Sequence, residues 1–187
     1  ALPWNKAARA LQARLQFLHG LGAVAGEWPD VSDAALLATL DDWLAPYLDG
    51  VTRRDHLPRL DLVAILKSRL DYAGQQALDR LAPTHLEVPS GSRVPIDYAG
   101  AAPSLAVRLQ EMFGLTATPT VGGGRVPLTI ELLSPAGRPV QVTRDLVSFW
   151  ARGYPEVKKE LKGRYPKHYW PEDPYQAEPT ARVRPRR

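Results

Sequence analysis

Residues 134–174 read SPAGRPVQVTRDLVSFWARGYPEVKKELKGRYPKHYWPEDP, and in this stretch apolar side chains alternate with cations. Packed apolar side chains hold neighbouring cations in place, so the alternation is typical of a folded surface that faces an anion. The apolar positions are Val140, Val142, Leu146, Phe149, Trp150, Val157 and Leu161, and the cations are Arg144, Arg152, Lys158, Lys159, Lys162, Arg164 and Lys167.

The start of this stretch predicts a β-hairpin. Residues 126–133 and 138–143 read as two strands, and the turn formers Ser, Pro, Ala and Gly at 134–137 join them. Three large apolar side chains follow the hairpin directly, and we expect them to be buried against it. They are Leu146, Phe149 and Trp150.

A helix and a tail are expected after the hairpin. Thr143 is a suitable cap for a helix that Gly153 breaks, and Pro155 then restarts a second piece that ends at Gly163. The remainder, 164–187, is rich in proline. We expect it to wrap over the surface before it frays in the terminal VRPRR.

Upstream of the hairpin, the sequence predicts further strands. Residues 85–88 and 93–98 read as short strands around a turn at 89–92. A proline in the first helical position predicts a helix over 103–113, and 118–121 can add a fifth strand. The strand count also allows a small OB-like barrel, although a helix between the second and third strands disfavours it.

The first 83 residues predict helices. Apolar residues from Trp4 to Leu18 recur at spacings of four and three, which indicates an amphipathic helix. Ser32 is expected to cap the next helix, and two more are expected over 60–67 and 71–81. The expected core positions are Trp4, Ala8, Leu11, Leu15, Leu18, Leu36, Leu40, Trp43 and Tyr47.

These elements together predict an α+β fold. An N-terminal helical half is expected to pack on a small antiparallel sheet with flanking helices. The expected domains are a helical subdomain at 1–83, the sheet with its helices at 84–163 and a basic tail at 164–187. A chain of 187 residues is long enough for one sizeable core or two small ones.

Composition narrows the class of protein. The chain has no cysteine, which excludes disulfides and zinc-thiolate sites and fits a reducing compartment. No apolar run reaches the roughly 18–20 residues that a membrane span needs. Residues 144–187 contain 11 Lys and Arg against 6 Asp and Glu, whereas residues 1–143 contain 13 against 14. The whole net charge of +4 therefore comes from the last quarter, which indicates a polyanionic partner or a solvated basic tail.

Patterns that carry catalysis are absent from the sequence. A phosphate-cradling loop needs GxxxxGK[ST], and no Gly-Lys dipeptide occurs in the chain. Residues 90–92, Ser-Gly-Ser, lack the GxSxG elbow and read as a turn. Residues 122–125, Gly-Gly-Gly-Arg, precede a strand, so they read as a hairpin loop in preference to an anion site. The histidines are isolated, so no metal site, cofactor site or catalytic residue is expected; they are His19, His56, His85 and His168.

The basic stretch is the strongest candidate site. Lys158 and Lys162 share one side of a helix and repel each other, which an anion between them would relieve. Rings beside cations suit single-stranded nucleic acid, although these rings can instead anchor the core or the tail. Glu172 and Asp173, beside Lys167, are expected to form a local salt bridge or cap to the basic surface. The candidate nucleic-acid-binding residues are Arg144, Arg152, Lys158, Lys159, Lys162, Arg164, Lys167, Tyr169 and Trp170.

Four runs in the second half carry a resemblance. They are LSPAGRPVQVTRDLVSFW, KELKGRYPKHYWPEDP, LAPTHLEVPSGS and AVRLQEMFGL. The chain resembles the C-terminal end of the bacterial HrpB-type ATP-dependent helicases, RNA-helicase-like proteins of the DEAH-box class. The resemblance implies a piece of a larger protein, and the DEAH signature of the motor is absent from this chain.

The function implied by this resemblance is that of a non-catalytic accessory domain that assists nucleic-acid binding. The implied partners are the motor domains of the same full-length chain and single-stranded RNA or DNA, in the cytoplasm and with no membrane. ATP and magnesium are implied for the motor domains, and no cofactor for this chain. The alternative is a structural module whose basic face docks on the helicase core or on another acidic protein.

Overall fold

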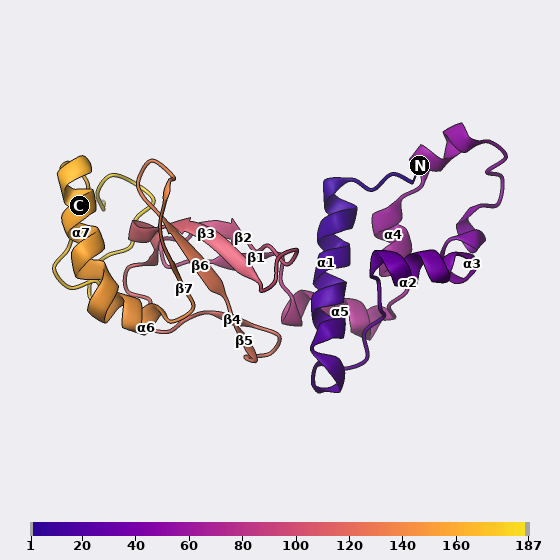
Figure 1. Ribbon diagram of the computed structural model, residues 1–187, viewed down its shortest axis with the longest axis horizontal. Coiled ribbons are helices and arrows are strands. Elements are labelled where there is room, and N and C mark those ends of the chain that lie inside the picture. The colour runs from indigo at the N-terminus through magenta and orange to yellow at the C-terminus, as the bar shows by residue number, and fades with distance from the viewer. Residues whose placement is uncertain (1, 186–187) are drawn as a thin grey trace. The chain divides into compact units, whose positions relative to one another are not determined.

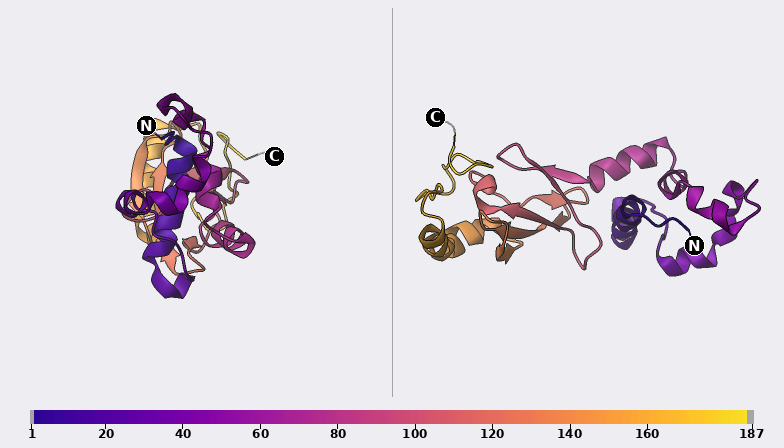
Figure 2. Two further views of the ribbon diagram at one scale, coloured as in Figure 1. Left: turned by 90° about the vertical axis from the view of Figure 1, so that its right-hand side faces the viewer. Right: turned by 90° about the horizontal axis from the view of Figure 1, so that it is seen from above.

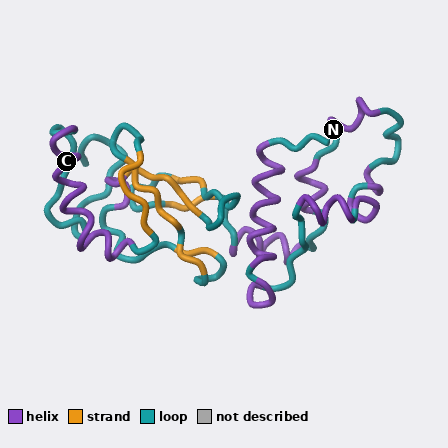
Figure 3. The backbone as a smooth tube through the Cα atoms, in the orientation of Figure 1, coloured by secondary structure: helices purple, strands orange, loops and turns teal. Residues whose placement is uncertain are grey.

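The computed structural model describes residues 2–185 and consists of two compact units, residues 1–83 and 84–187 (Figure 1). The first unit is helical, and the second combines strands with helices, which confirms the predicted α+β class (Figure 3). Each unit buries its own set of apolar side chains. Within residues 2–185, no helix is long and apolar enough to cross a membrane.

Helices of the first unit begin at the capping residues that the sequence offers. Asn5, Ser32, Asp61 and Asp71 each accept a hydrogen bond from a backbone N–H in the first turn of the helix that follows. The α-helices are α1 (Lys6–Gly20), α2 (Asp33–Ala38), α3 (Leu40–Trp43), α4 (Leu62–Lys67) and α5 (Tyr72–Leu81), and the 3₁₀ turns are η1 (Gly22–Ala25), η2 (Ala45–Tyr47) and η3 (Arg54–Arg59).

The first helix is the centre of this unit. Ala8, Leu11, Leu15 and Leu18 of its predicted stripe are buried, whereas Trp4 precedes the helix and is only half-buried, so its assignment to the core is wrong. The helix α1 contacts both α4 and α5. The predicted second helix is in fact two short helices, because the helical ladder is interrupted at Thr39 between α2 and α3. The prediction that Leu40 and Tyr47 belong to the core is therefore wrong: Leu40 is half-buried and Tyr47 is exposed.

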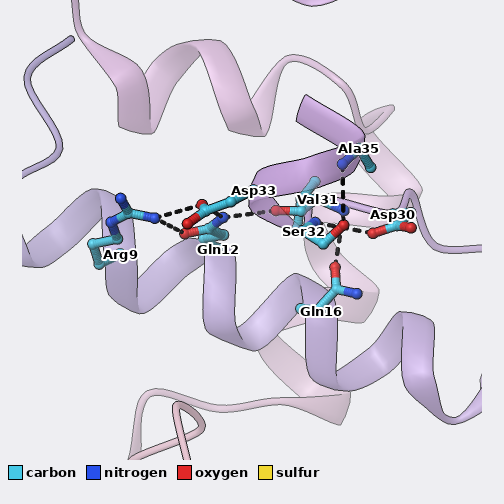
Figure 4. Close-up of polar contacts among 8 residues, drawn as sticks. All are labelled: Arg9, Gln12, Gln16, Asp30, Val31, Ser32, Asp33 and Ala35. Carbon is cyan, nitrogen blue, oxygen red and sulfur yellow. Dashed lines mark hydrogen bonds and ion pairs between the residues drawn. The ribbon is translucent and has the colours of Figure 1, made fainter. Parts of the chain in front are cut away.

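Polar residues of α1 hold the loop that precedes α2 (Figure 4). The Gln12 side chain donates to the Val31 carbonyl at 2.7 Å, and the Val31 N–H donates to the Gln16 side chain at 2.9 Å. Arg9 and Gln12 also donate to one oxygen of Asp33. Hydrogen bonds from Gln12 and Arg9 hold the pKa of the Asp33 carboxyl below its ordinary value. These side chains therefore anchor a loop that would otherwise have unpaired backbone groups.

Within residues 84–185, the strands form three small open sheets. In the largest, β6 pairs with β3 in parallel and with β7 in antiparallel register. The other two sheets are antiparallel pairs, β1 with β2 and β4 with β5. The strands are β1 (His85–Glu87), β2 (Arg93–Pro95), β3 (Ser104–Arg108), β4 (Thr120–Val121), β5 (Val126–Pro127), β6 (Thr129–Leu133) and β7 (Pro139–Thr143).

Three predictions about this unit are wrong. Residues 103–113 form β3 and the 3₁₀ turn η4 (Leu109–Met112) in place of a helix. Leu105 and Val107 are buried while Ala106 between them is exposed, so the period-two pattern prevails over the helical one. Because β3 then pairs parallel to β6, the sheet is mixed and not antiparallel. The sheets of the described residues are open, so the OB-like barrel is also wrong.

The predicted hairpin is confirmed for residues 129–133 and 139–143 by the antiparallel pairing of β6 with β7. The first predicted strand, 126–133, is however split, because residues 126–127 form β5 and pair with β4 in a separate sheet. The helix that follows differs from the prediction. Asp145, not Thr143, caps it, and α6 (Leu146–Ser148) continues through a π-helical turn, η5 (Phe149–Gly153), into α7 (Tyr154–Arg164). Gly153 therefore does not break the helix. A Cβ atom at Gly153 would lie 2.7 Å from the Phe149 ring, so glycine lets this ring pack against the helix.

An aromatic cluster forms the core beneath this helix. Leu146, Phe149 and Trp150 are buried, as predicted. The Phe113 ring lies 5.9 Å from both Trp150 and Tyr154, measured between ring centroids. The Trp150 indole N–H donates to the Leu115 carbonyl at 2.8 Å. Trp150 is thus a core residue with a satisfied polar group.

The tail after α7 is held by backbone hydrogen bonds. The Gly114 N–H donates to Pro174, and the Thr180 N–H donates to the carbonyl of Gln110. The Tyr169 N–H donates to the Val183 carbonyl, so the tail also folds back on itself. Pro174, Ala177 and Thr180 are buried. The predicted fraying of VRPRR is wrong for Val183 and Arg184, because the Val183 carbonyl accepts from the Tyr169 N–H and the Arg184 guanidinium donates to the Lys167 carbonyl. Residues 186–187 lie outside the described residues.

Candidate nucleic-acid interface

Six of the seven candidate cations are exposed on the second unit. Arg144 lies between β7 and α6, Arg152 lies in η5, and Lys167 follows α7. The other three exposed cations, Lys159, Lys162 and Arg164, are on α7 itself. Figure 2 shows α6, η5 and α7 running on as one helical segment. A continuous helix keeps the spacing of its cations constant, which a flexible loop does not.

Lys158 differs from the others because its ammonium has an internal partner. Its side chain is only 12% exposed, and its Nζ lies 2.5 Å from Glu172 Oε1, whose side chain is 91% exposed. A hydrogen bond and the charge from Lys158 lower the pKa of Glu172, and the charge of Lys162 adds to the effect. The anion expected beside Lys158 and Lys162 is thus the chain's own carboxylate. The predicted salt bridge of Glu172 to the basic surface is confirmed.

Arg164 also has a partner, but a weak one. Its guanidinium lies 3.6 Å from Glu160 one helical turn earlier, and both side chains are mostly exposed. Exposed pairs at this spacing contribute about 0.3–0.5 kcal/mol, so Arg164 can exchange partners easily. Asp173, the neighbour of Glu172, is used locally and accepts a hydrogen bond from the Tyr175 N–H.

The two candidate rings are half-buried and hold the tail in place. Tyr169 meets the edge of Phe113 with ring centroids 6.1 Å apart, and the Trp170 indole N–H donates to the Tyr165 carbonyl at 2.9 Å. Tyr165 in turn packs its ring against His168. These contacts favour the alternative that the rings are anchors for the tail.

Sequence reasoning missed a buried carboxylate in the second unit. Glu111 accepts hydrogen bonds from the hydroxyls of Ser90 and Ser92 at 2.9 and 2.5 Å, and its backbone carbonyl accepts from the Ser90 N–H. These bonds hold the turn between β1 and β2 against η4, in which Glu111 lies. Nothing in the local sequence joins Glu111 to two serines about twenty positions away, so no spacing pattern could have found the pair.

Two other features have a simple structural role. Gly122, Gly123 and Gly124 have positive φ angles of 67°, 69° and 84° and form the tip of the β4–β5 hairpin. Arg125 donates back to the Gly122 carbonyl at 2.8 Å, so the loop uses this cation internally. Between residues 2 and 185, no group of three or more His, Asp or Glu side chains could hold a metal ion.

A shallow groove of about 220 Å³ lies in the first unit. Its two charged residues, Arg9 and Asp33, pair with each other at 2.7 Å. The groove is otherwise apolar, so it offers little to orient a polar ligand. Its lining residues are Leu2, Trp4, Arg9, Asp33, Leu36, Leu37, Leu40 and Trp43.

Comparison with known proteins gives consistent matches. The family described as "ATP-dependent helicase C-terminal" matches residues 43–174. The ATP-dependent RNA helicase HrpB of Escherichia coli (strain K12) is 50% identical over 182 residues, which are 96% of this chain and 22% of that protein. The crystal structure of the E. coli DExH-box NTPase HrpB matches with a TM-score of 0.89 at 49% identity, over 97% of this chain and 22% of that one. A crystal structure of the E. coli DEAH/RHA helicase HrpB matches with a TM-score of 0.73 at 47% identity, over 90% of this chain and 21% of that one. The chain thus spans about a fifth of the length of these proteins.

Proposed function

This chain belongs to the ATP-dependent helicase C-terminal family, and from that premise we propose that it is a non-catalytic accessory domain that helps a helicase motor hold single-stranded RNA or DNA. In this proposal, ATP and Mg²⁺ serve the motor domains, and this chain binds neither. The motor domains are its protein partner, and it works in the cytoplasm.

One observation carries the proposal: three cations on the η5–α7 helix are exposed and form no ion pair with the described residues. Among residues 2–185, no ion pair engages Arg152, Lys159 or Lys162. A cation without an internal partner can neutralise a phosphate and release the counterion that the phosphate had condensed. Three such cations on one helical segment, with Arg144 and Lys167 at its two ends, form a surface suited to a nucleic-acid backbone.

Binding of this kind is expected to be modest and to depend on salt. If three or four phosphates are neutralised at once, log K falls with log salt at a slope of roughly −2 to −3 on a single strand. Phosphate contacts position the protein but do not read bases. The affinity is therefore expected to vary little among mixed sequences of equal length.

The test is binding of a labelled single-stranded RNA at two or more salt concentrations. Reversing two free cations, Lys159→Glu with Lys162→Glu, is expected to weaken binding equally for all RNA sequences and to make the salt slope less negative. The matched control reverses two exposed cations of the first unit, Arg53→Glu with Arg54→Glu, and is expected to leave affinity within about twofold. Equal losses in both double variants would refute the proposed surface.

A second candidate function is docking on the motor domains. Val142 on β7 and Val147 on α6 are 57% and 47% exposed, and Arg144 lies between them in sequence. Exposed apolar side chains beside cations also suit a protein partner. If the charge reversals at Lys159 and Lys162 leave RNA affinity unchanged but abolish association with the motor domains, docking is the correct function.

A further inference from the structure

The tail delivers a carboxylate to the middle of the basic helix. Glu172 Oε1 lies 2.5 Å from Lys158 Nζ, one helical turn from Lys162. The residues on both sides of the tail segment are fixed independently of this contact: the Pro171 carbonyl accepts from the Tyr154 hydroxyl at 2.7 Å, and the Pro174 carbonyl accepts from the Gly114 N–H at 2.9 Å. The backbone therefore holds Glu172 near Lys158, and the salt bridge is not what keeps the tail in place.

A carboxylate and a phosphodiester present the same chemistry to an ammonium group, namely an oxygen acceptor with a single negative charge. We propose, on the basis of the function proposed above, that Glu172 is an internal competitor for a nucleic-acid phosphate. The carboxylate occupies Lys158 in the free protein, and a phosphate of the bound strand displaces it.

Burial and exposure in this pair fit displacement. Lys158 has the less exposed side chain, at 12%, so its ammonium is already ordered, whereas the Glu172 side chain is 91% exposed and can rotate into solvent. Because the Glu172 carboxylate is already largely hydrated, its release into solvent costs little, and a phosphate that replaces it keeps the Lys158 ammonium paired. A strand that also contacts Lys159 and Lys162 can therefore displace the carboxylate, while an isolated anion gains too little to do so. Glu172 thereby favours polyanions over single anions.

A comparison of three variants with the wild-type chain of 187 residues tests the proposal, with a labelled single-stranded RNA of mixed sequence as the probe. Glu172→Gln removes the charge and keeps the shape, and it is expected to raise affinity about two- to fivefold. Glu178→Gln makes the same charge change at an exposed tail residue that the structure places in no ion pair within residues 2–185, and it is expected to change affinity less than about 1.5-fold. The gain from Glu172→Gln is expected to vanish when Lys158→Gln is also present.

The outcomes separate the two proposals. If the wild-type chain binds RNA in a salt-dependent manner but Glu172→Gln does not bind more tightly, the competitor is refuted and the accessory function stands. An equal gain in Glu178→Gln, or a gain that persists with Lys158→Gln, also refutes the competitor, because the effect is then one of net charge. If neither the wild-type chain nor Glu172→Gln binds at low salt, both proposals fail. A melting temperature of Glu172→Gln equal to that of the wild type confirms that the tail remains in place.

Discussion

Replacing Gly153 by alanine tests the close packing of the Phe149 ring against Gly153 in η5. Helix propensity alone predicts that the change stabilises the protein, because alanine is favoured over glycine by about 1 kcal/mol inside a helix. The structure predicts the opposite sign. A Cβ atom at Gly153 would lie 2.7 Å from Cδ2 and 3.0 Å from Cε2 of Phe149, closer than non-bonded carbon atoms approach.

The Phe149 ring has little freedom to move away from the new methyl group. It is buried, and its centroid lies 5.2 Å from that of Trp150, which packs in turn against Phe113 and Tyr154. Overpacking a tight core destabilises proteins by about 1–3 kcal/mol. After the favourable helix propensity is subtracted, Gly153→Ala is expected to destabilise the second unit by about 1 kcal/mol, and by about 2 kcal/mol at most.

The same helix offers a matched control. Gly163 lies near the end of α7, and a methyl group added there would meet no atom within 4 Å, so Gly163→Ala is expected to stabilise the unit by about 0.5–1 kcal/mol. Urea-dependent hydrogen exchange of peptides from residues 143–165 measures both effects within the second unit. In a Phe149→Leu background, the penalty of Gly153→Ala is expected to shrink, because the ring that it strikes is gone.

The clash with Phe149 is refuted if Gly153→Ala is as stable as the wild type or more stable while Gly163→Ala is stabilised as expected. It is also refuted if the penalty is unchanged in the Phe149→Leu background.

Trp150→Ala is expected to lower the free energy of unfolding by about 3–5 kcal/mol, because the side chain is 2% exposed and three aromatic rings surround it. An unchanged melting temperature would show that the core lies elsewhere. Asp33→Asn tests the network on α1: hydrogen bonds from Gln12 and Arg9 lower the pKa of Asp33 from 3.8, so its ionised form stabilises the fold above about pH 4, and this contribution is lost as the pH falls through the lowered pKa. Urea midpoints of the wild type and of Asp33→Asn are expected to differ at about pH 6 and to approach each other as the pH falls below 3.8; a difference that does not change with pH would contradict the assignment.

Local signals explain which parts of the fold could be predicted from the sequence. Ser32 as a helix cap, the stripe of α1 and the β6–β7 hairpin each depend on residues a few positions apart, and all three are confirmed. The stretch 104–112 could not be assigned in the same way, because the spacing of its apolar residues fits both a strand and a helix. Leu105, Val107 and Leu109 fit a strand, while Leu105, Leu109 and Met112 fit a helix. The parallel partner β6 favours the strand, and it lies about 25 residues further along the chain.

In the candidate site too, local features could be predicted from the sequence, whereas contacts between distant residues could not. Exposure of Lys159 follows from the helical pattern, because it lies on the opposite side of α7 from the buried Leu161. The identity of the cation that pairs with Glu172 depends instead on how the tail runs back along α7. An acidic residue in a basic region predicts a salt bridge, but only the path of the tail selects Lys158 over Lys167.

The docked tail has a consequence for biosynthesis. Gln110 and Gly114 receive backbone partners from Thr180 and Pro174, which the ribosome adds about 60–70 residues later. At a translation rate of about 5–20 residues per second, this interval lasts roughly 3–14 s. The first unit is synthesised before the interval begins, so its helices can assemble while translation continues. The second unit, by contrast, remains without its cover over Phe113 until the tail has emerged, and during those seconds the nascent chain presents an aromatic surface to chaperones.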